Sequence, residues 1–171
     1  MAFGFFKKND NKANQAENVL PNEASGKESD VLVMDNILIG EKSVDKEAAI
    51  EKAGQLLADS GYVLPEYIKA MKEREQLLTT YIGNGIAIPH GVGAAKNMIL
   101  KSGISIIQYP QGVVFGEGKI AYLVVGIAGK GNEHMQILTN LAEFIQDEEA
   151  VKELFTTTDK NKLYNAFTST I

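Results

Sequence analysis

Apolar residues recur at helical spacing between residues 43 and 61. Ser43 is predicted to cap this helix, with Asp45 and Glu47 in its first turn. Gly61 is the predicted end, because glycine readily adopts the left-handed conformation that follows many helices. The stripe expected to face the core consists of Ala49, Ile50, Ala53, Leu56 and Leu57.

A second helix is predicted to open at Leu64-Pro65, where a missing backbone N–H costs nothing. Its inward side chains are expected to be Tyr67, Ile68 and Met71. The run Lys72-Glu73-Arg74-Glu75 is expected to form its polar end.

From residue 79 onward the pattern changes to that of strands. Residues 80–82 and 86–88 are predicted as short strands around Gly83-Asn84-Gly85. Residues 99–107 and 120–128 are predicted as longer strands. The second of these, IAYLVVGIA, is apolar enough to lie in the centre of a sheet.

Helical patterns return after Gly129-Lys130-Gly131, where Asn132 is a candidate cap. Two shorter helices are expected near residues 148–155 and 159–167, with a solvated first turn at 147–149. The predicted buried face of the first of these three helices comprises Met135, Leu138, Leu141, Ala142 and Ile145. Helices on both sides of apolar strands predict an α/β or α+β sandwich, without fixing the strand order.

Composition narrows the function classes. The 171 residues include 17 basic and 22 acidic side chains, a net charge of −5, so no basic footprint for nucleic acid stands out. The chain has no cysteine, which excludes disulfides and thiolate chemistry and fits a reducing cytosol. No window approaches the roughly 18 apolar residues of a membrane-spanning helix.

The first thirty residues differ from the rest. Residues 7–30 are polar and mixed in charge, so residues 1–30 are predicted to be a flexible tail and residues 31–171 the folded domain. Phe3, Phe5 and Phe6 leave open the alternative that the tail docks on the domain or on a membrane surface.

His90 is the first of only two histidines and a candidate functional residue. It ends the run Gly83-Asn-Gly-Ile-Ala-Ile-Pro-His90-Gly91, in which glycines permit a close approach to a ligand and Pro89 stiffens the backbone. A structural histidine in a turn is the alternative.

His134 and Arg74 are the other candidates. His134 lies at the start of a predicted helix, where free N–H groups favour an anion, although a solvated first-turn histidine is the alternative. Arg74 is the only arginine beside sixteen lysines, which suggests a planar bidentate ligand for an oxyanion. An ordinary surface pair with Glu73 or Glu75 is equally consistent.

Other chemistry has little support. Neither a Walker loop nor a dinucleotide fingerprint is present, and Ser102 and Ser105 lie in no hydrolase motif. No cofactor and no metal site are predicted, because the spacing of the two histidines does not indicate a ligand set.

At these residues the sequence resembles the mannitol/fructose (type 2) enzyme IIA domains of the bacterial sugar phosphotransferase system. The resemblance extends from about residue 31 almost to the C-terminus. The stretches that show it are MKERE at 71–75, TYIGNGIAIPHG at 80–91, QYPQGV at 108–113 and GIA…NEHMQ between 126 and 136. The run NGIAIPHG is highly specific, and the last two stretches are similar to the mannitol branch.

The resemblance implies a phosphoryl relay on a mixed sheet flanked by helices. The phosphocarrier HPr would phosphorylate Nε2 of His90, and the group would pass to a cysteine of the EIIB domain of a mannitol permease. His134 would be the second active-site histidine and Arg74 the family's arginine. The implied location is cytoplasmic, with membrane contact only through the permease.

A carrier that serves two protein partners is expected to have a shallow, exposed site. One alternative remains a regulatory module that signals through His90 phosphorylation without sugar flux. A second is an interaction domain that is not phosphorylated. The sugar itself is set largely by the permease.

Overall fold

The computed structural model describes residues 30–169, so the predicted tail at residues 1–30 lies almost wholly outside the described residues. The elements, in chain order, are η1 (Met34–Asn36), β1 (Ile37–Leu38), α1 (Lys46–Asp59), α2 (Tyr67–Leu77), β2 (Tyr81–Gly83), β3 (Ile86–Ala87), η2 (Gly93–Met98), β4 (Gly103–Gly116), β5 (Lys119–Ala128), α3 (Glu133–Phe144), α4 (Glu148–Glu153) and α5 (Lys160–Thr168).

The strands form one mixed sheet in the order β1-β4-β5-β3-β2. β4 and β5 are an antiparallel pair, whereas β1 pairs with β4 and β3 with β5 in parallel. The apolar strand β5 is central, as the sequence predicts, because both of its edges carry partners.

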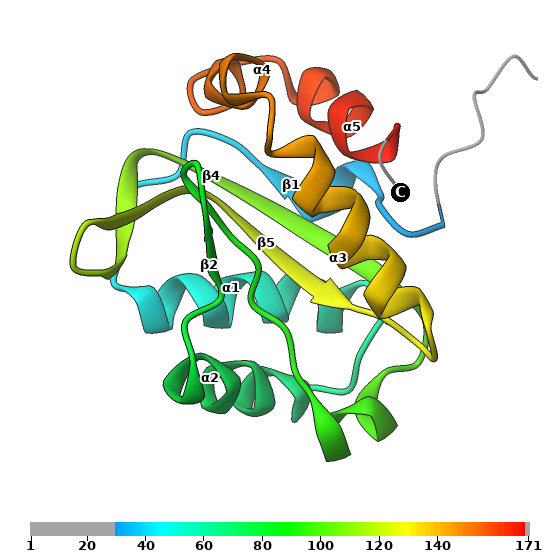
Figure 1. Cartoon of the computed structure of the whole chain (residues 1–171). Helices are drawn as coiled ribbons and strands as arrows, with labels where there is room; N and C mark the ends of the chain where they lie inside the picture. The colour runs from blue at the N-terminus through cyan, green and yellow to red at the C-terminus, as the bar shows by residue number, and fades with distance from the viewer. Residues whose placement is uncertain (1–29, 170–171) are drawn as a thin grey trace, which may run out of the picture.

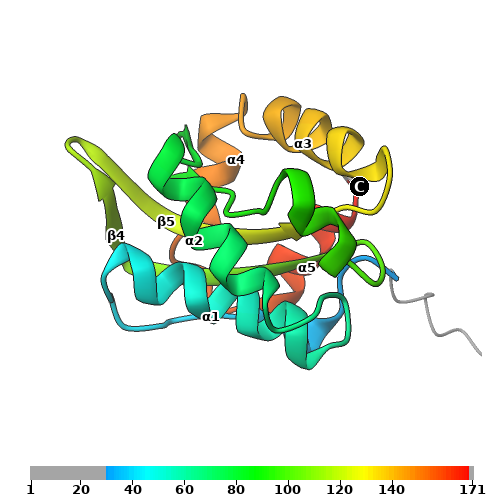
Figure 2. The ribbon, with the colours of Figure 1, turned by 90° about the horizontal axis from the view of Figure 1, so that it is seen from below.

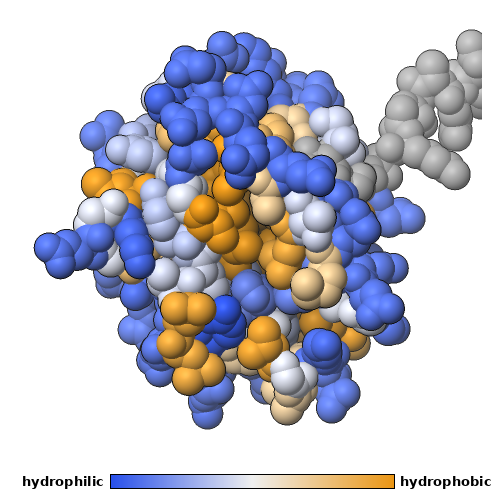
Figure 3. All heavy atoms as spheres, viewed as in Figure 1, coloured by the Kyte–Doolittle hydropathy of each residue, from blue (hydrophilic) through white to orange (hydrophobic). Residues whose placement is uncertain are grey.

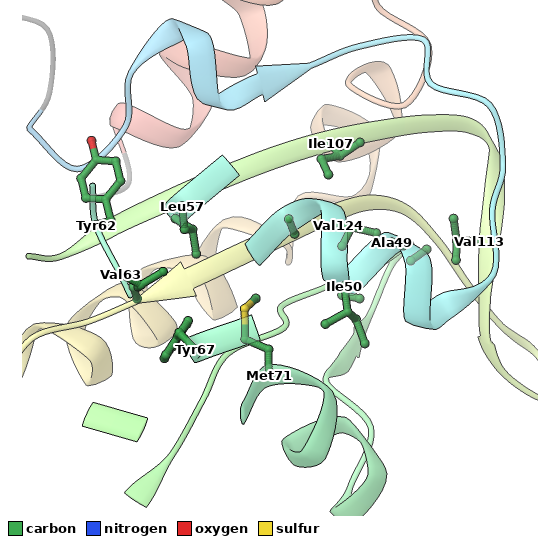
Figure 4. Packing of buried hydrophobic residues seen from close by; sticks show 14 of the residues in the cluster. Ala49, Ile50, Leu57, Tyr62, Val63, Tyr67, Met71, Ile107, Val113 and Val124 are labelled. Carbon is green, nitrogen blue, oxygen red and sulfur yellow. The ribbon is translucent and has the colours of Figure 1, made fainter. Parts of the chain in front are cut away.

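Helices cover both faces of the sheet, which confirms the α+β sandwich (Figure 1). On one face α1 and α2 lie side by side, as Figure 2 shows from below. Figure 4 shows Ile50 and Leu57 of α1 and Tyr67 and Met71 of α2 in the core between these helices and the sheet. The other face carries α3, α4 and α5, whose apolar side chains form a second core that includes Phe167.

The start of α1 differs from the prediction. The N-cap is Asp45, whose carboxylate accepts a hydrogen bond from Ala48 N at 2.8 Å. The hydroxyl of Ser43 instead donates to Gly112 O at 2.6 Å, which ties the segment before the helix to β4. The end is as predicted, since α1 stops at Asp59 and Gly61 has a φ of +76°.

The first long strand begins later and ends later than predicted. Residues 99–102 lie outside it, and β4 continues through Pro110 to Gly116. The pairing with β5 shifts register between Gln108 and Val113, and Gly112 has a φ of +78°. This irregularity accommodates the proline within the strand, which is why the pattern QYPQG did not indicate a strand.

The buried face of α3 is rotated from the prediction. Ile137, Leu141 and Ile145 are buried, whereas Met135 is 62% exposed and Ala142 is also exposed. One side of α3 faces the second core, and Ile137, Leu141 and Ile145 lie on that side. The helices predicted near 148–155 and 159–167 are present as α4 and α5.

Within the described residues, no helix is both long and apolar enough to span a bilayer. The same part of the chain contains no cluster of three or more side chains arranged to hold a metal ion.

We expect Asp45→Ala to lower the free energy of unfolding by about 1 kcal/mol, because the N–H of Ala48 loses its cap. Asp45→Asn is the control, since an asparagine oxygen caps nearly as well. Urea unfolding measures both changes. Equal losses in the two variants would show that the cap at Asp45 does not stabilise α1.

Candidate functional site

The two histidines lie together at one end of the sheet. Their ring centroids are 5.0 Å apart with the planes tilted by 50°. His90 follows β3 and forms a parallel bridge with Ile127 of β5, whereas His134 is the second residue of α3. Residues 44 positions apart in the sequence thus form one pair, as the functional interpretation requires.

The backbone around His90 is fixed to the central strand. Ile127 N donates to Pro89 O at 2.9 Å. The carbonyl of Ile127 accepts a hydrogen bond of 2.7 Å from the hydroxyl of Tyr67. The same hydroxyl accepts a hydrogen bond of 2.8 Å from Gly91 N. Tyr67 therefore bridges the residue after His90 to β5, a role that its apolar context in the sequence did not indicate.

Gly91 is required beside this hydroxyl. A Cβ there would lie 2.8 Å from the ring of Tyr67 and 2.9 Å from the Cβ of Ala95. The glycine after the histidine thus serves close packing of the loop on α2 and η2.

The imidazole of His90 is oriented by its own loop. Nδ1 lies 2.6 Å from Ile88 O. A carbonyl oxygen only accepts hydrogen bonds, so Nδ1 carries the proton and donates it. In the neutral ring Nε2 is then the nitrogen with the free lone pair.

Burial sets the protonation state of His90. The side chain is 6% exposed, and this desolvation lowers the pKa of His90 from 6.5. The Ile88 hydrogen bond raises the pKa, the charge of Arg74 lowers it and that of Glu75 raises it, all by less than burial does. The ring is therefore neutral near pH 7. A shallow, exposed site was expected, but His90 is buried.

His134 is half-buried and also has a lowered pKa, first because of burial and then because of His90 and Lys96. Its Nε2 is buried with no hydrogen-bond partner among the described residues. Asn132 is the N-cap of α3, as predicted, but within the described residues its side chain makes no capping hydrogen bond. A glycine at position 129 allows His134 to pack against it, since a Cβ at this position would lie 2.2 Å from the Cα of His134.

Arg74 is in the last turn of α2 and is partly exposed. Its Nη1 donates to Leu78 O at 2.6 Å. In the described part of the chain, Arg74 forms no ion pair with Glu73 or Glu75, which pair with Lys69 and Lys46 instead. The surface-pair interpretation is therefore wrong, and the charge of Arg74 acts on His90.

Apolar side chains next to the site residues in sequence are exposed. Leu77 and Leu78 follow Arg74 and are 81% and 67% exposed, and Val92 and Met135 lie close to His90 and His134 in sequence and are also exposed. Figure 3 shows hydrophobic atoms gathered in the middle of the face seen there, with hydrophilic atoms around them. A contiguous hydrophobic patch such as the one in Figure 3 is typical of protein-docking surfaces.

A family model described as "Phosphoenolpyruvate-dependent sugar phosphotransferase system, EIIA 2" matches residues 30–170. The mannitol-specific phosphotransferase enzyme IIA component of Bacillus subtilis is 48% identical over 137 residues, which cover 80% of this chain and 96% of that protein. The mannitol-specific EIICBA component of Escherichia coli is 47% identical over 131 residues, which are 75% of this chain and 21% of that longer protein.

Among solved structures, the chain is similar to enzyme IIA of mannitol from Escherichia coli in its complex with phosphorylated enzyme IIB. The TM-score is 0.77 at 44% identity, with 81% of this chain and 97% of that chain covered. The resemblance inferred from the sequence is confirmed by these matches.

Tyr67→Phe is expected to lower the free energy of unfolding by about 1–3 kcal/mol, because Gly91 N and Ile127 O lose their partner. Tyr109→Phe is the matched control. Tyr109 is equally buried, but its hydroxyl has no hydrogen-bond partner in the described structure, so its removal is expected to be neutral or stabilising. Denaturant unfolding distinguishes the two, and equal effects would contradict the bridging role.

Both histidines are expected to titrate below pH 6.5 in the folded chain. Between the folded and unfolded pKa values the unfolded chain binds more protons, so the free energy of unfolding falls as the pH drops below about 6.5. NMR titration of the rings and unfolding at pH 7.5 and 5.5 measure these effects. A pKa at or above 6.5 for His90 would contradict the desolvation argument.

Proposed function

This chain belongs to the EIIA 2 family of the phosphoenolpyruvate-dependent sugar phosphotransferase system, and we propose that it carries the phosphoryl group on Nε2 of His90. It is a mannitol-specific EIIA component, a phosphotransferase component whose partner is EIIB. The proposal adds that HPr is the donor and that His134 and Arg74 stabilise the transferring group.

The observation that carries the proposal is the hydrogen bond from His90 Nδ1 to Ile88 O. It fixes the tautomer and leaves Nε2 as the nucleophile. Burial of the ring keeps it neutral near pH 7, so the lone pair is available without loss of a proton.

Phosphoryl transfer needs positioning and charge stabilisation more than covalent assistance from the protein. Arg74 brings a fixed positive charge that already acts on His90. His134 brings a buried Nε2 with no partner among the described residues, beside the His90 ring. We assign these two groups to the oxygens of the transferring phosphoryl.

Each transfer exchanges one bond to phosphorus for another. In the first, Nε2 of His90 bonds to phosphorus while the bond to the donor breaks, and its electron pair stays on HPr. In the second, the EIIB cysteine thiolate bonds to phosphorus and the P–N bond breaks, which returns the electron pair to Nε2. Because imidazole is both nucleophile and leaving group, the relay is reversible.

Both transfers need a protein partner over the histidines. The exposed Leu77, Leu78, Val92 and Met135 offer that contact, since apolar groups at an interface exclude water from the reacting atoms. Because His90 is buried, a partner must approach its Nε2 closely, and these exposed apolar residues provide the contact that permits the approach.

After incubation with enzyme I, HPr and phosphoenolpyruvate, we expect the intact mass to rise by one acid-labile phosphoryl group. His90→Gln is expected to gain none, because it lacks the accepting nitrogen. Intact-mass spectrometry decides. A gain in His90→Gln would overturn the assignment of the nucleophile.

We expect Arg74→Lys to slow transfer from phosphorylated HPr by at least about 10-fold, because lysine lacks the planar guanidinium fork. His134→Gln is also expected to slow transfer. Rapid-quench measurement of both half-reactions, HPr to this chain and this chain to EIIB, gives the rates. A wild-type transfer rate in either variant would show that the substituted residue does not stabilise the transferring phosphoryl group.

The second half-reaction also tests the regulatory alternative. The relay requires that wild type, once phosphorylated on His90, pass the group to a mannitol-type EIIB. Phosphorylation without onward transfer would support a signalling module instead.

A further inference from the structure

Glu75 is a buried carboxylate that the relay described above does not use. Glu75 is 5% exposed, although the sequence pattern predicted that it belongs to the polar end of α2. An acidic side chain in the last turn of a helix faces the negative end of the helix dipole, which is unfavourable. Its burial there therefore requires compensating contacts.

Three hydrogen bonds and one ion pair supply the compensation. Oε2 of Glu75 accepts hydrogen bonds of 2.7 Å from Thr80 N and of 2.6 Å from Thr80 Oγ1. Oε1 accepts 2.7 Å from Thr79 Oγ1 and lies 3.6 Å from Nζ of Lys46. The carboxylate thus fixes Thr80 through its main chain and its side chain together.

From Thr80 the contacts continue to the nucleophile. Thr80 O accepts a hydrogen bond of 2.9 Å from Ile88 N, and Ile88 O in turn accepts a hydrogen bond of 2.6 Å from His90 Nδ1. Residue 80 precedes β2 and residue 88 follows β3, so this contact fixes the strand ends that deliver His90. Each step is a hydrogen bond between buried or half-buried groups, which leaves little freedom for the carbonyl that orients the imidazole.

We propose that Glu75 is a positioning residue for His90, acting through Thr80 and Ile88 to hold the acceptor of the Nδ1 proton in place. The proposal rests on His90 being the phosphoryl acceptor. Glu75 does not touch the reacting atoms. Its effect is to keep Nε2 unprotonated and aimed, because a shifted Ile88 carbonyl releases Nδ1 and permits the other tautomer.

The test compares Glu75→Met with Gln108→Met. Methionine keeps the length of each side chain and removes its hydrogen-bonding groups. Gln108 is the matched control, because it is 1% exposed and makes three hydrogen bonds, to Gly40 N after β1 and to Leu154 O and Thr157 O after α4. Both variants lose three hydrogen bonds, but only Glu75→Met loses the connection to His90.

Two readouts are used on the full chain. The first is the tautomer of His90, from long-range ¹H–¹⁵N NMR of the ring, which requires no phosphoryl donor. The second is the rate of transfer from phosphorylated HPr. We expect Glu75→Met to populate the Nε2–H tautomer and to slow transfer by about 10- to 100-fold, as misplacement of a catalytic group does. Gln108→Met is expected to keep the wild-type tautomer and rate.

Glu75→Gln separates position from charge. A glutamine oxygen accepts from Thr80 and its amide donates to Thr79 Oγ1, so we expect the wild-type tautomer and a rate within about 3-fold of wild type. A loss as large as in Glu75→Met would assign the effect to the negative charge and overturn the positioning role.

Thr80→Val keeps the proposal falsifiable if Glu75→Met does not fold. It removes one of the two hydrogen bonds to Thr80, and we expect a smaller change of tautomer in the same direction. An unchanged tautomer in Thr80→Val, or equal rates in Glu75→Met and Gln108→Met, would overturn the proposal. If wild type accepts no phosphoryl group, the proposed function fails, while the tautomer still tests Glu75.

Discussion

The site depends on the attachment of one irregular loop to the end of the central strand. Ile127 is fully buried in β5, and its N–H and C=O bind the segment around His90 through Pro89 and Tyr67. A loop held only by its side chains would carry unsatisfied backbone groups in a buried place, at a cost of about 1–3 kcal/mol each. Joining it to the sheet satisfies these groups and gives the imidazole a rigid base.

Helix α2 contributes to this base in three ways. Its first residue, Tyr67, holds the backbone after His90, and its last turn carries both Arg74 and Glu75. The charge of Arg74 acts on His90, whereas Glu75 binds Thr80, whose carbonyl accepts a hydrogen bond from Ile88, the residue that orients the His90 ring. A single helix therefore influences both the position and the electrostatics of His90. Gly54 of α1 lets this helix pack closely, since a Cβ there would lie 2.8 Å from Ile68 and 2.9 Å from Met71.

The polar groups of the site are few, which suits a carrier. A phosphoryl group that leaves as readily as it arrives requires moderate stabilisation. In the proposed relay this comes from one arginine and one neutral histidine, which supply less charge than a site built to retain phosphate. The proposed relay has one further requirement, a partner that closes the site during transfer, and the exposed apolar residues close to these groups in sequence are proposed to contact it.

The sequence by itself determined the helices, the central strand and the two histidines, because hydrophobic periodicity and the run around His90 are local signals. It misplaced the cap of α1, since Ser43 instead binds Gly112, which lies far away in the sequence. It also misplaced the bounds of β4, since this strand continues past Pro110 and keeps its pairing with β5 through a shift of register. Only the tertiary structure decided that His90 and His134 meet, that Tyr67 and Glu75 are buried polar supports, and which nitrogen of His90 is free. These depend on which backbone groups lack a partner once the sheet has formed, and that is not a property of any one segment.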